Sequence, residues 1–363
     1  MTLLLMTPGP TRVPDRVLAA GATPMIHHRT EEFSRILAST LERLRPLFGT
    51  AGDVLPVHAT GRGALEAAVT NLLSPGDEVL ACCNGLFGEM WAKIAQKFGI
   101  VVHRVCCDWG TSADPLLIEA ALEAHPHSRA VILAHSDTST GALNDVAAIA
   151  GVTGRTGALF MVDAVSSLGG APFRFDDWGV DVAVTASQKC LMSSPGLSFV
   201  ALSEKAWKAH EASRLACSYF DFPAIKRMLA RPKPETPGTT PVHLLLQVHA
   251  ALGLIEAEGL ENVYARHEEM ARLAREGARD LGMSLQCPGL KRFSPTLTAI
   301  RVPDGISPQS IRDQLKARGI LTARGLGGYE ATSFRIGHMG DIRPADVRRT
   351  LDALGEVVGA LGR

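Results

Sequence analysis

The stretch Val180-Asp-Val-Ala-Val-Thr-Ala-Ser-Gln-Lys189 is an apolar run that ends in a hydroxyl, an amide and a lysine, and the turn signal Pro195-Gly196 follows it. A short apolar run before a turn signal is typical of a buried strand. In open α/β sheets, functional groups gather beyond the carboxyl ends of the parallel strands. The stretch therefore predicts a buried strand with Lys189 at the functional edge of the sheet.

Similar apolar runs alternate with helical patterns through the first two thirds of the chain. We expect strands at residues 78–83, 100–107, 129–135, 158–163, 180–186 and 197–202. Between them, residues 88–98 carry apolar positions at helical spacing, and Asp114-Pro115 supplies an N-cap and a first-turn proline for a helix through Ala124. Apolar strands separated by helices predict an α/β fold whose mainly parallel sheet is covered on both faces.

The composition changes at residues 231–241, which contain four prolines and therefore predict a loop. Helical patterns follow at residues 242–258 and 260–281, a third helix is expected from Ser307-Pro308 to Gly319, and a fourth at residues 345–361. We therefore expect three parts: an N-terminal arm (residues 1–20), a large domain (residues 21–258) and a smaller C-terminal α/β domain (residues 259–363).

Charge and hydropathy exclude several classes of protein. The 363 residues contain 37 basic and 37 acidic side chains, so the chain lacks the positive surface typical of nucleic-acid binding. No window approaches the ~20 apolar residues of a membrane span, and Thr2-Leu-Leu-Leu-Met6 is too short for the core of a signal peptide. These features predict a cytoplasmic protein without nucleic-acid or membrane partners.

Cysteine and histidine spacings give no sign of a metal. None of the seven cysteines forms a CxxC motif, and the twelve histidines form no HExxH motif. The adjacent pairs Cys82-Cys83 and Cys106-Cys107 are poorly placed for disulfides, and we expect reduced thiols that pack as small apolar side chains. The sequence predicts no metal site.

A glycine-rich turn, His58-Ala-Thr-Gly-Arg-Gly63, precedes a helical stretch of small and apolar residues. Free N–H groups at such a helix start favour an anion, so Thr60, Gly61 and Arg62 are candidate phosphate ligands. Glu66 stands where a dinucleotide fingerprint requires its third glycine, which argues against a nicotinamide oxidoreductase.

Two further strand ends carry polar side chains. His135-Ser-Asp-Thr-Ser-Thr-Gly141 gathers hydroxyls around Thr138, and the strand at residues 158–163 ends in Asp163. Taken singly, these residues also fit a helix cap or a buried hydrogen-bonded carboxylate, and Lys189 fits a solvated lysine. Because these strand ends and the turn at Thr60 can share one crevice, a strand-end aspartate and lysine predict a pyridoxal phosphate site.

The chain resembles the class V aminotransferases, in particular the alanine–glyoxylate and serine–glyoxylate branch. Six motifs carry the resemblance in order: Thr7-Pro-Gly-Pro10, Asn84-Gly-Leu-Phe-Gly88, Thr138-Ser-Thr-Gly141, Asp163-Ala-Val-Ser-Ser-Leu-Gly-Gly170, Ser187-Gln-Lys189 with Pro195-Gly196, and Arg335-Ile-Gly-His-Met-Gly340. The resemblance implies fold type I of the pyridoxal phosphate enzymes, with a mainly parallel large domain, and a homodimer with active sites at its interface.

The resemblance also implies roles for the residues around the cofactor ring. Lys189 would form the internal Schiff base and later move a proton at the substrate Cα, and Asp163 would pair with the pyridine nitrogen. Phe87 and Val165 would pack on the two ring faces, and Thr138 would reach the ring hydroxyl.

Two other groups of residues would bind the phosphate and the substrate. Five residues would hold the phosphate: Thr60, Gly61, Arg62, Gln188 and, from the second subunit, Thr239. Arg335 would bind the substrate carboxylate in a bidentate pair, with Gly9 also at the substrate. Arg62 and Thr236 depart from the residues that relatives often have, so their contribution to cofactor affinity is left open.

The implied reaction moves an amino group from a small amino acid such as alanine or serine to a 2-oxo acid such as glyoxylate or pyruvate. Aspartate, pyridoxamine and ureidoglycine are alternative donors, because one arginine fixes a carboxylate and not a side chain. A lyase or desulfurase is a weaker alternative: Gln188 stands where such enzymes usually have histidine, and Cys287 lies in no catalytic context. A non-enzymatic subunit is disfavoured by the presence of Lys189, Asp163 and Arg335 together.

Overall fold

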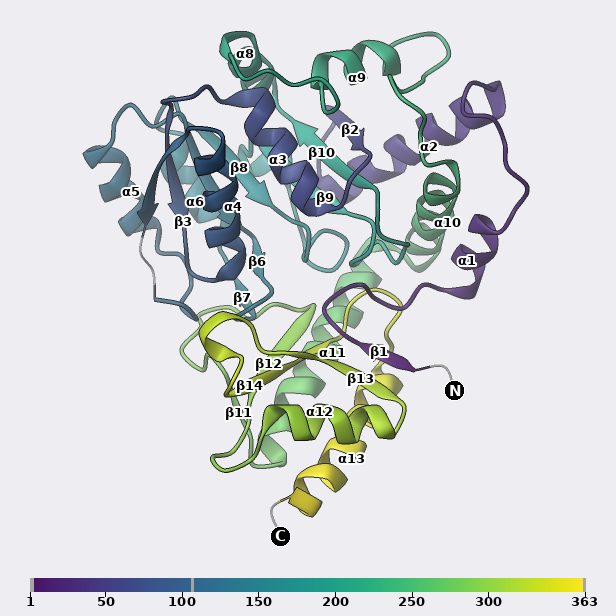
Figure 1. Cartoon of the computed structure of the whole chain (residues 1–363), viewed down its shortest axis with the longest axis vertical. Coiled ribbons are helices and arrows are strands. Elements are labelled where there is room, and N and C mark those ends of the chain that lie inside the picture. Colours follow the sequence, from purple (N-terminus) through teal and green to yellow (C-terminus); the bar gives the residue numbers. More distant parts are fainter. Residues whose placement is uncertain (1–2, 106–107, 362–363) are drawn as a thin grey trace.

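A seven-stranded sheet forms the centre of the larger part of the molecule in this computed structural model, which describes residues 3–105 and 108–361 (Figure 1). In spatial order its strands are β2 (Asp53–Val57), β10 (Ser198–Leu202), β9 (Val182–Ala186), β8 (Leu159–Asp163), β5 (Ala130–Ala134), β3 (Glu78–Cys82) and β4 (Val101–Val105). The strands from β9 to β4 run parallel, as expected. Only the pairings of β10 with β9 and with β2 are antiparallel.

Two layers of helices cover this sheet. One face packs against α2 (Glu31–Phe48), α5 (Pro115–Ala124), α6 (Val146–Thr153), α7 (Phe175–Trp178) and α10 (Val242–Glu258). The other packs against α3 (Gly61–Leu72), α4 (Leu86–Lys97), α8 (Glu204–Ala212) and α9 (Phe222–Leu229). Along β5, Val131 and Leu133 join the first core while Ala130 and Ile132 join the second, the alternation that a strand imposes. The expected three-layer arrangement is confirmed.

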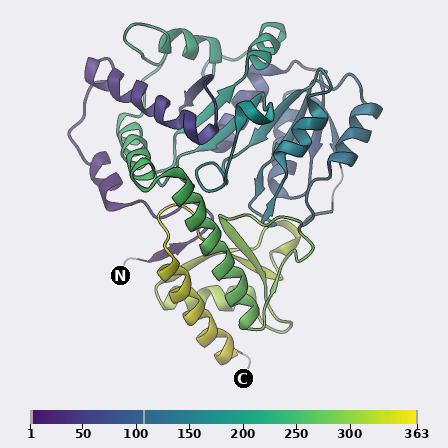
Figure 2. The ribbon, with the colours of Figure 1, turned by 180° about the vertical axis from the view of Figure 1, so that it is seen from behind.

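A second sheet lies in the smaller part of the molecule, which contains both the first strand and the last helix of the chain (Figures 1 and 2). Its order is β1 (Leu4–Met6), β13 (Ile320–Arg324), β14 (Ser333–Gly337), β12 (Leu297–Arg301) and β11 (Ser284–Leu285). Three helices pack on it: α11 (Leu260–Asp280), α12 (Pro308–Ala317) and α13 (Pro344–Leu361). Gly259, with φ of 84°, separates α10 from α11 at the expected start of the C-terminal domain.

Four short elements complete the described chain. They are α1 (Asp15–Gly21), the hairpin strands β6 (Ser136–Asp137) and β7 (Ala142–Leu143), and the 3-10 turn η1 (Gly327–Tyr329). None of the helices in the described ranges is long and apolar enough to cross a membrane.

The first strand ties the N-terminus to the small sheet. Residues 4–6 of the expected N-terminal arm form β1, which pairs in parallel with β13, Leu4 opposite Ile320 and Met6 opposite Thr322. The sequence did not predict this pairing, because three apolar residues do not specify a partner more than 300 positions away. The division into three domains otherwise stays a prediction.

Most expected elements are present with small shifts at their ends. The helix expected at residues 88–98 begins at Leu86, and the Asp114 carboxylate accepts the Leu116 N–H at 3.0 Å as the predicted N-cap of α5. Residues 231–241 form neither helix nor strand. Cys190 and Cys287 are free thiols, and the pair Cys106-Cys107, at the end of an expected strand, lies outside the described residues.

We expect Met6→Ala to destabilise the small domain, because Met6 is fully buried in a core shared with Phe334 and Ile336. Removing a buried side chain of this size costs about 2–5 kcal/mol. Leu5→Ala, on the opposite side of the same strand and only half-buried, is the matched control and should cost less. Urea unfolding of the two variants measures the difference, and equal losses would contradict the packing role of β1.

Candidate active site

Lys189 lies just beyond the carboxyl end of β9, at the functional edge that the sequence predicts. Its side chain is only 9% exposed, and its Nζ donates a hydrogen bond to the Pro8 carbonyl of the N-terminal segment. Burial, together with the positive charge of Arg335, lowers the pKa of Lys189 to about 8. About one tenth of the amine is therefore neutral, and hence nucleophilic, at pH 7.

The N-terminal segment crosses directly over the lysine. A Cβ placed on Gly9 would lie 2.4 Å from Lys189 Cδ, and Gly9 has φ of 89°, which only glycine adopts readily. The Thr11 N–H donates to the Gln188 carbonyl at 3.1 Å. Gly9, expected beside the substrate, therefore packs on the stem of Lys189 and limits where that side chain points.

Asp163 ends β8, the strand next to β9, with Asp163 opposite Val184 in the ladder. The carboxylate is buried and accepts the Val165 N–H at 2.9 Å. Burial raises the pKa of Asp163 to about 6, against the opposing effects of this N–H and of Lys189. A buried carboxylate with a raised pKa is stabilised by a cationic partner, because a nearby positive charge favours its ionised form.

The glycine-rich turn meets the Asp163 turn. Thr60 is the N-cap of α3, and its side chain makes no capping hydrogen bond. A Cβ on Gly61 would lie 2.8 Å from Val165 Cγ2, so only glycine lets the helix start approach so closely. The start of α3, with its first N–H groups, therefore lies beside the Asp163 turn and lines the same crevice. Arg62 is exposed at this turn.

Asp137 is a site residue that the sequence reasoning did not single out. Its fully buried carboxylate accepts the N–H groups of Phe87 at 2.9 Å and of Ser139 at 2.8 Å. The Ser139 hydroxyl accepts the Leu86 N–H at 3.0 Å, so β6 caps the start of α4 across the fold. A Cβ on Gly85 would lie 2.2 Å from the Asp137 carboxyl carbon. Burial raises the pKa of Asp137 although these donors oppose it.

Arg335 reaches this cluster from β14 of the second sheet. Its Nη1 donates to the Thr138 carbonyl and its Nε to the Arg324 carbonyl, each at 2.8 Å. These bonds use two of the five guanidinium N–H groups and leave three for a ligand. Burial lowers the pKa of Arg335 to about 10, and the negative charge of Asp137 opposes that shift. Arg335 is thus a fixed cation where the second sheet meets the β6–β7 hairpin.

Nearly all predicted site residues form one connected set. Phe87 is held by Asp137, and the Thr138 hydroxyl shares a hydrogen bond of 2.6 Å with the Ser166 hydroxyl, next to Val165. Thr239 is the exception: it is exposed on the proline-rich loop. Thr236, in the same loop, is buried and shares a hydrogen bond of 2.6 Å with Thr240, so its hydroxyl is held within the loop.

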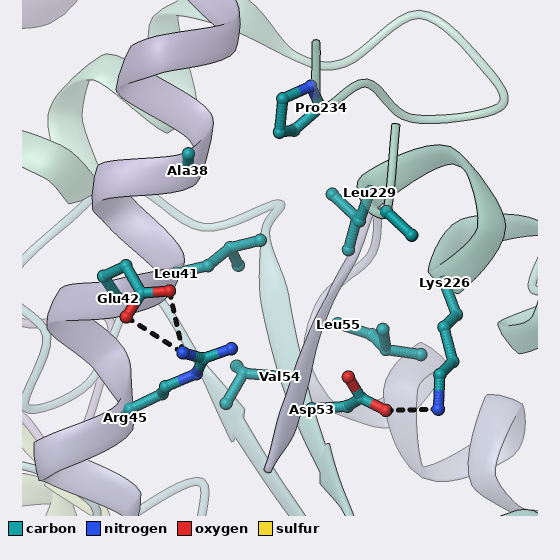
Figure 3. A pocket seen from close by; sticks show the side chains of 11 residues that line it. Ala38, Leu41, Glu42, Arg45, Asp53, Val54, Leu55, Lys226, Leu229 and Pro234 are labelled. Carbon is teal, nitrogen blue, oxygen red and sulfur yellow. Dashed lines mark hydrogen bonds and ion pairs between the residues drawn. The ribbon is translucent and has the colours of Figure 1, made fainter. Parts of the chain in front are cut away.

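A different hollow, on the face near α2 and α9, is not this site (Figure 3). It has a volume of about 260 Å³ and contains two surface ion pairs, Lys226 with Asp53 at 2.6 Å and Arg45 with Glu42 at 2.8 Å. None of the predicted site residues lines it. Partly exposed ion pairs of this kind contribute little to stability and offer no chemistry.

Residues 4–343 match the family model described as aminotransferase class V. The chain belongs to the class V aminotransferase family. It is 38% identical to the L-aspartate–glyoxylate aminotransferase of Paracoccus denitrificans, over 94% of this chain and 87% of the relative. It is also 39% identical to a protein of Anabaena cylindrica named soluble hydrogenase 42 kDa subunit, over 99% and 94% of the two chains.

A solved alanine–glyoxylate aminotransferase from Nostoc has the same fold, with a TM-score of 0.94 and 31% identity over 98% of this class V chain and 95% of that one. The family and the fold make the protein a transaminase, and its fold is that of the pyridoxal phosphate-dependent aminotransferases. The motifs by which the sequence resembles this family therefore identified it correctly.

The crevice of this class V transaminase fits pyridoxal phosphate. In the described part of the chain, the buried Gln188 Oε1 has no hydrogen-bond partner, and buried polar atoms normally have one. The uncapped start of α3 offers N–H donors to a phosphate, and Gly61 keeps this approach open. Lys189 and Asp163 supply an amine and a carboxylate at adjacent strand ends.

We expect Asp137→Asn to destabilise the site, because the amide NH₂ would face one of the two backbone N–H donors that the carboxylate now accepts. Leaving buried donors unsatisfied costs about 1–3 kcal/mol each. Asp145→Asn, at the partly exposed N-cap of α6, is the matched control, since it also replaces a capping carboxylate. Urea unfolding should show the larger loss for Asp137→Asn, and equal losses would argue against a special role for Asp137.

Proposed function

We propose that this class V transaminase uses pyridoxal phosphate to move an amino group from a small amino acid, such as alanine or serine, to a 2-oxo acid such as glyoxylate or pyruvate. The observation that carries the proposal is the buried Lys189, whose lowered pKa leaves a reactive amine between the Asp163 carboxylate and the Arg335 guanidinium. An amine, an anion and a cation in one crevice are what a cofactor ring and an α-amino acid carboxylate require.

The residues that would hold the cofactor surround this amine. Lys189 would bind its aldehyde carbon covalently, Asp163 would pair with the ring nitrogen, Phe87 and Val165 would cover the ring faces, and Thr138 would meet the ring hydroxyl. The start of α3 would hold the phosphate, through Thr60, Gly61, Arg62 and Gln188. When bound, the cofactor supplies an electron sink for the negative charge that develops at the substrate Cα.

The chain's own groups perform the proton transfer and the positioning. In its neutral form, the Lys189 amine would take the proton from the substrate Cα and later return one. Burial favours this neutral form and excludes water from the amine. Asp163 would stabilise a positive charge at the ring nitrogen.

Arg335 orients the substrate. The carbonyls of Thr138 and Arg324 fix the guanidinium before any ligand binds, and the three remaining N–H groups can take a carboxylate in a bidentate pair. Pre-positioning lowers the entropy lost on binding. The same contact is available to every α-amino acid, so aspartate and ureidoglycine remain alternative donors. Pyridoxamine, which has no carboxylate, remains an alternative donor that would not use this contact.

A homodimer fits the placement of Thr239. Thr239 is exposed on a single chain, whereas a phosphate ligand must reach a crevice. We infer that Thr239 reaches the phosphate of a second copy and that each active site lies at the interface. A cytoplasmic location remains a prediction from the sequence.

A single-turnover panel tests the function. Purified holoenzyme is mixed with alanine, serine, aspartate, ureidoglycine or pyridoxamine, and the visible absorbance of the bound cofactor is followed as it converts to the amine form. We expect fast conversion with at least one small amino acid. A protein that binds the cofactor but shows no conversion with any of these amines would be a cofactor-binding subunit and not a transaminase. The relative named soluble hydrogenase 42 kDa subunit raises this alternative.

Lys189→Ala tests the lysine itself. We expect this variant to lose both the borohydride-reducible linkage to the cofactor and the conversion, because no other amine replaces the one that points into the crevice. Lys205→Ala is the matched control, since Lys205 also donates to a main-chain carbonyl, that of Ala158, but belongs to α8. A reducible linkage that survives in Lys189→Ala would refute the assignment.

We also expect the rate of cofactor capture by the apoenzyme to rise with pH and level off above about pH 8, where Lys189 becomes mostly neutral. Below that value the neutral fraction changes about tenfold per pH unit. Asp163 raises the pKa of Lys189, so Asp163→Asn should move the midpoint to lower pH. Stopped-flow absorbance gives the profile, and a midpoint near the ordinary lysine value of 10.5 would contradict the burial argument.

A further inference from the structure

Three potential metal ligands meet at the far edge of the large sheet. Glu78 begins β3, His103 lies on the edge strand β4, and His125 caps the end of α5. The ladder pairs Glu78 with Val101 and Leu80 with His103, so Glu78 and His103 share one face of the sheet. The end of α5 brings His125 over that face.

The ligand atoms converge on one carboxylate oxygen. Glu78 Oε2 lies 2.8 Å from His103 Nε2 and 3.7 Å from His125 Nδ1, and all three atoms lie within 4.8 Å of one another. Two ligands of a tetrahedral zinc ion are about 3.4 Å apart when each bond is ~2.1 Å. The 3.7 Å pair is close to this spacing, and the 2.8 Å pair, now at hydrogen-bond distance, would have to open by about 0.6 Å around an ion. Two imidazoles with a carboxylate are a common zinc donor set.

The surroundings favour a cation. The last carbonyls of α5 place partial negative charge beside His125, which stabilises positive charge there. In the described part of the chain, Glu78 forms ion pairs with these two histidines and with no lysine or arginine. The three side chains are about one third exposed, so an ion can enter from solvent.

One rearrangement is required. The two imidazole rings are stacked, with centroids 3.6 Å apart and planes 19° from parallel. Stacked rings cannot both direct their in-plane lone pairs at one ion, so one ring must turn about its Cβ–Cγ bond. His125 is at a helix end and partly exposed, which leaves room for the turn.

We propose that Glu78, His103 and His125 form a site for a divalent transition metal of the zinc class, which joins the edge strand β4 to the end of α5. Water fills the remaining coordination position. The site lies toward the N-terminal ends of the parallel strands, whereas Lys189 lies at their carboxyl ends, so it is separate from the transamination site. Its role is to stabilise the sheet edge.

Titration calorimetry of the holoenzyme with Zn²⁺ tests the proposal, alongside the visible absorbance of bound Co²⁺. We expect one ion per chain, and at least tenfold weaker binding in His103→Gln, His125→Gln and Glu78→Gln. His127→Gln is the matched control: it removes an exposed histidine two positions from His125 and should bind as the wild type does. Zn²⁺ should also raise the melting temperature of the wild type and of His127→Gln only.

Two outcomes would overturn the site. One is the absence of Zn²⁺ binding tighter than about 1 mM in the wild type, which would leave a hydrogen-bonded histidine pair only. The other is equal binding in all variants, which would place the ion elsewhere. Cofactor loading of each variant is measured in parallel, so that failure of this site is distinguished from failure of the transaminase assignment.

Discussion

The burial of the Lys189 ammonium is the constraint on which the active site depends. An amine this enclosed loses water and, among the described residues, has the Pro8 carbonyl as its acceptor, so its proton is held weakly. Three separate parts of the chain impose this environment: the end of β9, the N-terminal segment at Gly9, and Arg335 on β14. The lowered pKa of the lysine thus depends on the packing of these three segments and not on its own strand alone.

Asp137 lies in the hairpin that links the start of α4 to Arg335. Its carboxylate holds the start of α4, and thereby Phe87, while the carbonyl of the next residue, Thr138, holds Arg335. Phe87 and Arg335 are therefore both held by one short hairpin.

Two questions are separate for this protein: which type of reaction it catalyses and which substrate it takes. The family accounts for the reaction type, because the amine, carboxylate and guanidinium are all present and connected. The relatives carry different substrate names, and a guanidinium that binds a carboxylate does not select the substrate side chain. The cluster of Glu78, His103 and His125 bears on neither question. It lies at the β4 edge of the sheet, toward the N-terminal ends of the parallel strands.

The sequence by itself determined the alternation of strands and helices, the glycine-rich helix start, and the strand-end positions of Asp163 and Lys189. These follow from local periodicity and turn chemistry, which act over a few residues. Only the tertiary structure decided the direction of β10, the pairing of β1 with β13, the capping of α4 by Asp137, and the meeting of Glu78 with His103 and His125. Each of these joins residues far apart in the chain, and no local pattern encodes such a contact, because it depends on how whole elements pack.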